Sequence, residues 1–236
     1  MNQQASTSSG GNEKVNHRPP IVLDESDEKK RIRQLILRKR DAMPQKKRED
    51  KSRRITETIL ALPAYQQADD VLCFRSFGSE YQTNDLIQTA LEDGKSVYLP
   101  RVEGRRVMSF YKYEDGDTLE TNRYGIEEPV PDTARLWTPN MKDSSGSIRR
   151  ALVIVPCVAF DPRLNRIGYG AGYYDGFVSQ SRRKMRGAEA PASDDSLIFF
   201  AGAAFALQMI KEPLPMEAQD QKTDLFVTEY GTILGE

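Results

Sequence analysis

The chain contains 236 residues, with 34 basic and 35 acidic side chains and a formal net charge of −1. This length suits one α/β domain or two small ones, and the balanced charge gives no general reason to expect binding to nucleic acid or to a membrane surface. The only histidine is His17, which precedes the predicted folded region, so a histidine general base and a histidine-ligated metal are excluded.

Residues 1–25 are rich in Gln, Ser, Gly and Asn, which predicts a disordered polar leader ahead of a single α/β domain over residues 26–236. No apolar run is long enough to span a membrane, and the leader lacks the hydrophobic centre of a signal peptide. We therefore expect a cytoplasmic protein. Cys73 and Cys157 each lie within an apolar run, so we expect buried small side chains rather than disulfide partners or zinc ligands.

Two basic helices are predicted next. The first begins at Ser26 or Asp27, and the second covers residues 45–62 after Pro44, a residue suited to a helix start. Lysine and arginine are frequent throughout residues 29–54. A basic run of this kind is usually a solvated helix face, which is the interpretation that the residues alone favour.

A strand–loop–helix–strand unit follows. Its predicted elements are a strand over residues 71–77, a helix capped by Thr83 or Asn84 and ending near Glu92, and a strand over residues 95–102. Such a unit normally forms a right-handed crossover between parallel strands. Because ligands of these sheets bind beyond the carboxyl ends of the strands, Phe77 and Glu80 occupy a favourable position. Taken alone, Glu80 is an ordinary loop acid.

The second half of the chain contains further strand patterns. They predict an antiparallel edge strand at 107–113, a buried strand in the apolar run at 151–160, another at 197–205 and a last strand at 224–229, with a helix at 174–185 and polar loops at 132–149 and 187–196. The alternation of strands and helices predicts a three-layer α/β/α domain with a mixed, mostly parallel central sheet.

Glycine occupies every second position of residues 168–172, here called the glycine loop, which follows the apolar run. Glycine lets the backbone approach a ligand closely, and the helix expected next presents unpaired N–H groups to an anion. Arg166 before the loop can neutralise phosphate, and Tyr-Tyr-Asp at 173–175 can contact a substrate or hold a hard cation. The spacing is neither the dinucleotide fingerprint nor a Walker loop, and a tight strand-to-helix turn is the alternative interpretation.

The stretch from Pro156 to Asp175 reads P-C-V-A-F-D, four residues, and then R-I-G-Y-G-A-G-Y-Y-D. It closely resembles the signature of the 5-formyltetrahydrofolate cyclo-ligase family, also called 5,10-methenyltetrahydrofolate synthetases, and the resemblance extends over about residues 29–229. The fold it implies is of the NagB/RpiA/CoA transferase-like type. Eukaryotic members often carry a basic residue within the glycine run, whereas this chain has Tyr169 and Ala171 there and looks more like the bacterial form.

The resemblance implies an ATP site built from the first helix and the glycine loop. The family's K-x-x-x-R pair matches Lys29 and Arg33, whose spacing places both on one helix face, with Lys30 as an alternative register. The implied ATP ligands are Lys29, Lys30, Arg33, Arg166, Gly168, Tyr169, Gly170, Ala171, Gly172, Tyr173 and Tyr174, of which Arg166, Tyr173 and Tyr174 are implied to be catalytic.

The resemblance also implies a Mg²⁺ site and a folate site. The implied metal ligands are Asp175 and the D-x-x-x-D pair Asp220 and Asp224, with Gln219 where bacterial relatives usually have histidine. The implied folate-binding residues are Phe77, Glu80, Thr83, Tyr124 and Tyr173. In the family, a Glu in an E-x-x-T pattern binds the pterin, and a carboxylate suits this role because it can accept two parallel N–H bonds. Arg101 or Arg123 can serve a glutamate tail.

The implied reaction is the ATP- and Mg²⁺-dependent conversion of 5-formyltetrahydrofolate to 5,10-methenyltetrahydrofolate, with release of ADP and phosphate, through an imino-phosphate on the formyl group. Phosphoryl transfer depends mainly on positioning and charge neutralisation, so the lack of a nucleophilic serine, cysteine or histidine motif is expected. We expect a monomer whose partners are these two small molecules, without nucleic acid or membrane.

Two functions of other classes remain as alternatives. A sugar-phosphate isomerase on a related scaffold needs a general base near the glycine loop and no ATP. A nucleotide- or RNA-binding module that uses the basic helices predicts binding with a steep salt dependence, although the chain has no RNA-binding motif.

Overall fold

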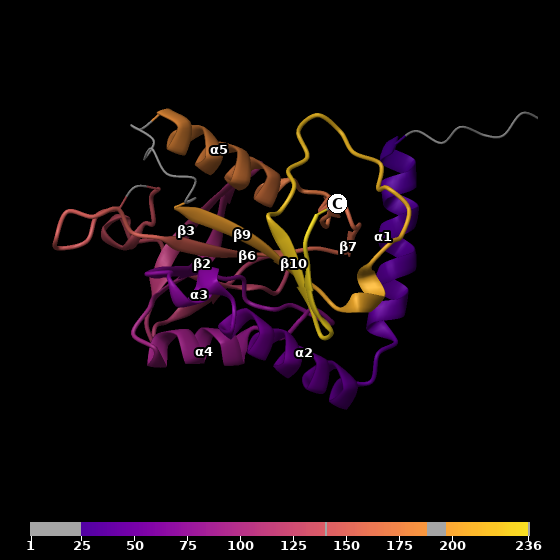
Figure 1. The fold of residues 1–236 in the computed structure, drawn as a ribbon, viewed down its shortest axis with the longest axis horizontal. Coiled ribbons are helices and arrows are strands. Elements are labelled where there is room, and N and C mark those ends of the chain that lie inside the picture. Colours follow the sequence, from indigo (N-terminus) through magenta and orange to yellow (C-terminus); the bar gives the residue numbers. More distant parts are fainter. Residues whose placement is uncertain (1–24, 140, 188–196, 236) are drawn as a thin grey trace, which may run out of the picture.

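The computed structural model describes residues 25–139, 141–187 and 197–235, and seven strands of this part of the chain form one sheet (Figure 1). In sheet order the strands are β11 (Gly231–Ile233), β10 (Leu225–Thr228), β9 (Ile198–Ala203), β6 (Ala151–Pro156), β1 (Asp70–Leu72), β2 (Ser96–Gly104) and β3 (Val107–Tyr113). The five strands from β10 to β2 are parallel, and an antiparallel strand lies at each edge. The predicted mixed, mostly parallel sheet is confirmed.

Helices cover both faces of this sheet. They are α1 (Glu25–Asp41), α2 (Gln45–Leu60), α3 (Pro63–Gln66), α4 (Asn84–Glu92) and α5 (Tyr173–Gly187), with 3₁₀ turns η1 (Thr133–Arg135) and η2 (Ala206–Gln208). Two small hairpins pair β4 (Leu119–Thr121) with β5 (Glu127–Pro129) and β7 (Ala159–Phe160) with β8 (Arg166–Ile167). Figure 1 shows α5 on one face, α2 and α4 on the other, and α1 beside one end of the sheet.

Strand β6 shows why the central strands are apolar throughout. Successive side chains of a strand point to opposite faces of the sheet. Leu152 and Ile154 join the core cluster beneath α2 and α4, whereas Val153 and Val155 join the cluster beneath α5. Because helices cover both faces, neither set of side chains can be polar. The three layers expected from the sequence follow directly from this arrangement.

The strand predicted at 71–77 ends much earlier, at Leu72. Side chains of the following loop form hydrogen bonds with backbone N–H and C=O groups that a longer strand would pair with a neighbouring strand. The Thr83 hydroxyl donates to the Phe74 carbonyl at 2.7 Å and accepts from the Ser76 N–H at 3.2 Å, while the Glu80 carboxylate accepts from the Phe77 N–H at 2.8 Å. These bonds fold residues 73–77 into a loop at the end of the sheet. Thr83 therefore occupies the N-cap position of α4 without capping it through its side chain.

The apolar run at 151–160 is also divided, because β6 ends at Pro156 and β7 begins at Ala159. The Gln208 side-chain amide donates to the carbonyls of Cys157 at 2.8 Å and Val158 at 3.1 Å, so a side chain replaces a neighbouring strand there. The chain then turns into the β7–β8 hairpin, which the sequence did not suggest. This hairpin carries the chain away from the sheet before it enters the glycine loop.

Other boundaries differ by a few residues. The second helix ends at Leu60 rather than at residue 62. A new short helix begins at Pro63, and the residue that precedes a proline, here Leu62, disfavours the helical conformation. The last predicted strand is followed by β11, which forms an unforeseen antiparallel hairpin with β10.

The leader expected over residues 1–25 lies outside the described residues except for Glu25, which begins α1. Of the loop predicted at 187–196, only residue 187 is described. No helix in the described ranges is both long and apolar enough to cross a membrane.

Gly202 in β9 provides a test of the packing on this sheet. A Cβ atom added there would lie 2.1 Å from Phe226 Cε1, and the Phe226 ring is stacked on Phe160 with centroids 4.2 Å apart. Gly202→Ala should therefore lower the free energy of unfolding by about 1–3 kcal/mol in urea denaturation. Gly104→Ala is the control, since no described residue other than its chain neighbours has an atom within 4 Å of a Cβ added there. Equal stability of the two variants would contradict this packing.

Candidate active site

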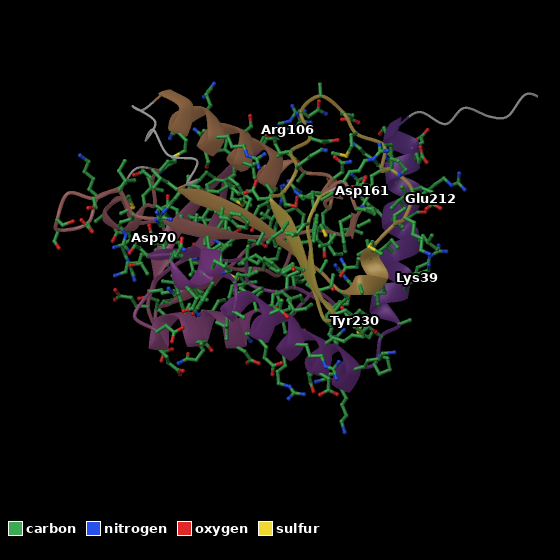
Figure 2. The ribbon with its side chains drawn as sticks, viewed as in Figure 1. Lys39, Asp70, Arg106, Asp161, Glu212 and Tyr230 are labelled. Carbon is green, nitrogen blue, oxygen red and sulfur yellow. The ribbon has the colours of Figure 1, made fainter. Side chains whose placement is uncertain are left out.

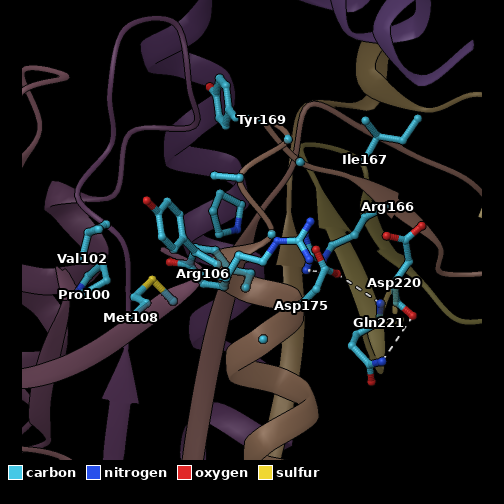
Figure 3. Close-up of a pocket in the computed structure, with 18 of the residues that line it drawn as sticks. Pro100, Val102, Arg106, Met108, Arg166, Ile167, Tyr169, Asp175, Asp220 and Gln221 are labelled. Carbon is cyan, nitrogen blue, oxygen red and sulfur yellow. Dashed lines mark hydrogen bonds and ion pairs between the residues drawn. The ribbon is translucent and has the colours of Figure 1, made fainter. Parts of the chain in front are cut away.

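A cavity of about 920 Å³ opens beyond the carboxyl ends of the central strands, where parallel sheets usually bind ligands. Its walls come from the first turns of α1, the segments after β1 and around the β4–β5 turn, the β2–β3 hairpin, the glycine loop, the start of α5 and residues 217–221. Figure 3 shows Arg166 and Asp220 on one side of this pocket and Pro100 and Met108 on the other.

The cavity brings together most of the residues that the sequence singled out. Those that line it are Lys29, Lys30, Arg33, Phe77, Glu80, Tyr124, Arg166, Gly168, Tyr169, Gly170, Ala171, Gly172, Tyr173, Tyr174, Asp175 and Asp220. Those that do not line it are Thr83, Asp224 and the two arginines considered for a glutamate tail, Arg101 and Arg123. Thr83 is completely buried, and its hydroxyl is used on the backbone of the loop after β1, so it shapes that loop and does not face the cavity.

Asp224 is held on the sheet instead of facing the cavity. Its carboxylate accepts hydrogen bonds from Arg182 Nη2 at 2.9 Å and from the Phe200 N–H at 2.7 Å. These contacts tie the start of β10 to β9 and α5. The D-x-x-x-D pattern therefore contributes one carboxylate to the cavity, that of Asp220, and the prediction of Asp224 as a metal ligand does not fit the structure.

The glycine loop joins β8 to the first turn of α5 and has the geometry of an anion cradle. Gly170 and Gly172 have φ angles of 104° and 73°, a region that side chains rarely adopt. The Arg33 Nε donates to the Gly168 carbonyl at 2.7 Å, and its guanidinium carbon lies 3.6 Å from the Cβ position of Gly170. The loop is thus open to a ligand on its backbone, with a guanidinium beside it and a helix N-terminus after it.

Arg166 lies in β8 and is 5% exposed. Its Nη2 donates to Asp175 Oδ1 at 2.8 Å, and the Gln221 N–H donates to the same oxygen at 3.1 Å. Its Nε is buried without a hydrogen-bond partner among the described residues, and the Tyr174 hydroxyl is in the same state. A buried polar atom without a partner costs free energy, so these two groups are suited to meet a ligand.

The pKa of Tyr174 is raised well above its ordinary value, mainly by burial and further by the nearby Cys73 and Glu80. The phenol therefore stays protonated across the neutral range and acts as a hydrogen-bond donor rather than as a base. A second partly buried ring, Tyr173, lines the cavity next to it at the start of α5.

The two predicted registers for the α1 lysine are distinguished by the structure. Lys29 is buried, and its ammonium lies 2.5 Å from Asp220 Oδ2 and 3.4 Å from Glu217. Lys30 lines the outer edge of the cavity, but its largely exposed side chain pairs with Asp27 at 2.9 Å. Lys29 and Arg33 therefore form the inward-facing pair one helical turn apart.

Asp175 and Asp220 place two carboxylates in the cavity, the kind of ligand that Mg²⁺ prefers. In each carboxylate, the contacts above use only one of the two oxygens, Oδ1 of Asp175 and Oδ2 of Asp220. In the described part of the chain, no group of three or more His, Cys, Asp or Glu side chains could hold a metal ion alone. Mg²⁺ is usually bound by one or two carboxylates together with substrate phosphates and water, and two carboxylates beside a phosphate cradle fit that requirement.

Glu80 is a buried carboxylate in the same cavity, only 6% exposed. Burial raises its pKa, an effect partly offset by the Phe77 N–H, the Tyr169 hydroxyl and the charge of Arg40. Arg40 is itself buried and donates to the Tyr169 hydroxyl at 2.6 Å and to Ser79 Oγ at 3.0 Å. Tyr169 thus links the glycine loop to Arg40 and Glu80.

Two aromatic side chains at the mouth of the cavity are exposed, Phe77 by 44% and Tyr124 by 51%. The β4–β5 turn that carries Tyr124 approaches Phe77 closely, because a Cβ on Gly125 would lie 3.4 Å from Phe77 Cε2. Glu128 also lines the cavity, but its carboxylate accepts from Asn122 Nδ2 at 2.8 Å and from a β2 backbone N–H. Glu128 therefore positions the turn.

Three residues of this site were not foreseen. Arg40 is one cation in a basic run, and no pattern distinguishes it from its exposed neighbours. Glu217 lies in a polar stretch with no strong signal before Asp220. Arg106 lies at a hairpin turn, where an arginine is ordinary. All three can be identified as residues of this site only from the folded structure, which brings distant segments together around the cavity.

Comparison with known proteins agrees with this fold and identifies a family. The model of the 5-formyltetrahydrofolate cyclo-ligase family matches residues 25–229. A Schizosaccharomyces pombe protein named probable 5-formyltetrahydrofolate cyclo-ligase is 32% identical over 177 residues, covering 74% of this chain and 81% of the relative. The 5-formyltetrahydrofolate cyclo-ligase of Escherichia coli K12 is 29% identical over 143 residues, covering 60% of this chain and 74% of the relative.

Among solved structures, the NMR structure of Aquifex aeolicus 5,10-methenyltetrahydrofolate synthetase matches with a TM-score of 0.69 and 26% identity, covering 87% of this chain and 92% of that one. A Mycoplasma pneumoniae 5,10-methenyltetrahydrofolate synthetase has the same fold, with a TM-score of 0.58 at 17% identity and coverage of 85% and 98%. Since the family match spans nearly all of the domain and the glycine loop carries its signature, the chain belongs to the 5-formyltetrahydrofolate cyclo-ligase family and is an enzyme of that family.

Proposed function

We propose that the protein converts 5-formyltetrahydrofolate to 5,10-methenyltetrahydrofolate in an ATP- and Mg²⁺-dependent reaction that releases ADP and phosphate. One observation carries the proposal: Lys29, Arg33 and Arg166 gather around the glycine loop in a cavity that Glu80 also lines. Cations and the N–H groups of a glycine loop suit a triphosphate, whereas a buried carboxylate suits the hydrogen-bond donors of a pterin. The names of the family and of its members support the same substrate.

The proposed chemistry begins with activation of the formyl oxygen, which is a poor leaving group. This oxygen attacks the γ-phosphorus of ATP, and the bond from that phosphorus to the β–γ bridging oxygen breaks, its electron pair leaving with ADP. N10 of the resulting imino-phosphate then attacks the former formyl carbon and loses its proton. The carbon–oxygen bond breaks, phosphate departs with the formyl oxygen, and the five-membered ring of the methenyl product is complete.

The chain's cations are proposed to bind and orient the triphosphate. Arg33 and the glycine-loop N–H groups contact phosphate oxygens, and Arg166 uses its unpaired Nε on the transferred group. The Tyr174 hydroxyl donates a hydrogen bond at the junction of phosphate and formyl group, beside Tyr173. Preorganised donors of this kind stabilise the charge that develops during transfer without having to move.

Asp175 and Asp220 are proposed to hold Mg²⁺ against the phosphates. The metal, when bound, neutralises charge on the phosphate oxygens. Arg166 and the Gln221 N–H fix the orientation of Asp175, and Lys29 fixes that of Asp220. Lys29 is thereby also placed to neutralise phosphate from the first turn of α1.

The folate is proposed to bind at the opposite set of cavity residues, Glu80, Phe77 and Tyr124. Glu80 accepts hydrogen bonds from the pterin, and Phe77 and Tyr124 contact its apolar body at the mouth of the cavity. The volume of about 920 Å³ is near the upper end for small-molecule sites, which suits a cavity that must hold two substrates together.

We also propose that the protein acts as a monomer, since all proposed ligands of both substrates lie in one cavity of one chain. A cytoplasmic location is a separate proposal, made from the sequence. Size-exclusion chromatography with light scattering tests the first point. Fractionation of the native cells tests the second, which matters because a relative from Arabidopsis thaliana is named as mitochondrial.

The reaction is tested by mixing the purified protein with 5-formyltetrahydrofolate, ATP and Mg²⁺ and following the near-ultraviolet absorbance of methenyltetrahydrofolate. We expect a rise that is absent without ATP and is abolished when EDTA removes the metal. A rise without ATP would contradict the proposal, as would no rise from a protein shown to be folded. The second outcome would favour the isomerase or RNA-binding alternatives.

A further inference from the structure

The tip of the β2–β3 hairpin lies against the start of α5 and carries Arg106 into the cavity (Figures 2 and 3). The contact is close: the Arg106 carbonyl oxygen lies 3.0 Å from the Cβ position of Gly176, and the Arg106 Nε lies 3.6 Å from that of Gly172. A Cβ atom at Gly176 would be unusually close to the hairpin backbone, whereas one at Gly172 would be in ordinary van der Waals contact with the Arg106 side chain. The hairpin tip is therefore packed directly on the start of α5.

Arg106 differs from the other arginines that line the cavity. Arg75 pairs with Glu127 at 2.6 Å, Arg166 pairs with Asp175 at 2.8 Å, and the Arg33 Nε is bonded to the Gly168 carbonyl. In the described part of the chain, Arg106 has no ion pair or hydrogen bond to its side chain, and it is exposed. Its charge is therefore available to a ligand in the cavity.

The backbone at Arg106 is also unusual, with a φ of 60°. Glycine adopts this left-handed region at no steric cost, whereas other residues are strained there. The hairpin turn thus holds an arginine where its backbone conformation favours glycine. A side chain kept at such a position beside a cavity points to a role for the side chain itself.

We propose that Arg106 is a phosphate-binding residue for the nucleotide, supplied by the β2–β3 hairpin across the cavity from α1. The proposal rests on the proposed function and extends its set of ligands. Arg33 packs on Gly170 and Arg106 packs on Gly172, so two guanidiniums flank the backbone of the glycine loop. The planar guanidinium donates paired N–H bonds to phosphate, and both lie beside the N-terminus of α5, where an anion is favoured.

This placement favours the phosphates over the carboxylates of the folate tail. Arg106 contacts Gly172 and the start of α5, next to Asp175, whereas the groups that we assign to folate lie around Glu80 and Phe77. The buried Arg166 Nε, which has no partner in the described residues, gives independent support for an anion at this end of the cavity.

The test compares Arg106→Gly with Arg105→Ala. The glycine variant removes the side chain and relieves the backbone strain, so it should unfold at the same or a higher temperature than the wild type. Arg105 is the adjacent exposed arginine and does not line the cavity, so its variant loses the same charge without the proposed contact. Arg106→Lys keeps the charge but loses the planar fork.

Isothermal titration calorimetry with Mg²⁺ and a non-hydrolysable ATP analogue should give a dissociation constant at least about tenfold higher in Arg106→Gly. Arg106→Lys should fall between that value and the wild type, and Arg105→Ala should match the wild type. The affinity for 5-formyltetrahydrofolate alone should be unchanged in all three variants. An unchanged nucleotide affinity in Arg106→Gly, an equal loss in Arg105→Ala, or a loss confined to folate would each overturn the proposal.

The wild-type titration separates this proposal from the proposed function. If the wild type binds no ATP analogue, the proposed function fails, and Arg106 is judged with inorganic tripolyphosphate. Binding of tripolyphosphate that Arg106→Gly loses and Arg105→Ala retains would then support an anion site at this position. Equal binding of tripolyphosphate by Arg106→Gly and Arg105→Ala would overturn the assignment of an anion site to Arg106.

Discussion

Arg166→Ala is expected to lower kcat/KM by about 10²–10³-fold, equivalent to about 3–4 kcal/mol of transition-state stabilisation. Arg166 is buried, its Nη2 orients Asp175, and its Nε is unpaired and available to the transferred phosphoryl group. One substitution therefore removes a preorganised donor and releases a proposed metal ligand. Steady-state kinetics of the methenyltetrahydrofolate absorbance change measure the effect, and most of it should appear in kcat.

The control for this variant is Arg182→Ala. Arg182 forms an ion pair with Asp224 at 2.9 Å, similar in length to the 2.8 Å pair of Arg166 with Asp175, but neither Arg182 nor Asp224 lines the cavity. Its removal should change kcat/KM by about twofold at most, because the pair lies outside the cavity and a partly exposed ion pair contributes little to stability. Circular dichroism melting of both variants separates lost chemistry from lost folding. Full activity in a folded Arg166→Ala variant would show that Arg166 does not contact the transferred group.

Glu80→Gln is expected to raise the KM for 5-formyltetrahydrofolate by about 10–100-fold, while the affinity for ATP stays unchanged. The ionised carboxylate can accept two N–H bonds from the pterin, whereas the amide presents one acceptor and one donor. Folding should not suffer. Because burial raises the pKa of Glu80 in the folded state, ionisation at neutral pH opposes folding, and the neutral glutamine removes that cost.

The same shift predicts a pH dependence. As the pH falls through the raised pKa of Glu80, the carboxyl gains a proton and loses its ability to accept two bonds, so the wild-type KM for folate should rise on the acid side. In Glu80→Gln this acid limb should be absent. Glu127→Gln serves as the control, because Glu127 is exposed and paired with Arg75. A wild-type acid limb that persists unchanged in Glu80→Gln would show that another group titrates.

Much of the fold was predictable because its strongest patterns are local. The apolar run containing β6 favours a strand covered on both faces, and the glycine loop followed by α5 has the composition of a strand-to-helix ligand turn. The length of β1 was not predictable. It depends on Thr83 and Glu80 bonding to the loop backbone, and their sequence positions do not show that they turn toward that loop.

The site was predictable where its residues belong to one short segment or one helix face, as in the glycine loop and the pair Lys29 and Arg33. It was not predictable where a polar side chain can either bind a ligand or form hydrogen bonds within the protein. Asp224 fits a metal-binding spacing as well as Asp220 does, but the Phe200 N–H and Arg182 hold its carboxylate on the sheet. Arg106 was not predictable for another reason: it lies in the cavity only because the β2–β3 hairpin approaches α5.

The most direct measurement follows the formyl oxygen. Incubating the protein with ATP, Mg²⁺ and 5-formyltetrahydrofolate that carries ¹⁸O in its formyl group, followed by mass spectrometry of the released phosphate, reports where this oxygen goes. Transfer of the γ-phosphoryl group to the formyl oxygen predicts one ¹⁸O atom in each phosphate released. Phosphate without the label, formed together with the methenyl product, would contradict phosphorylation of the formyl group and the roles derived from it.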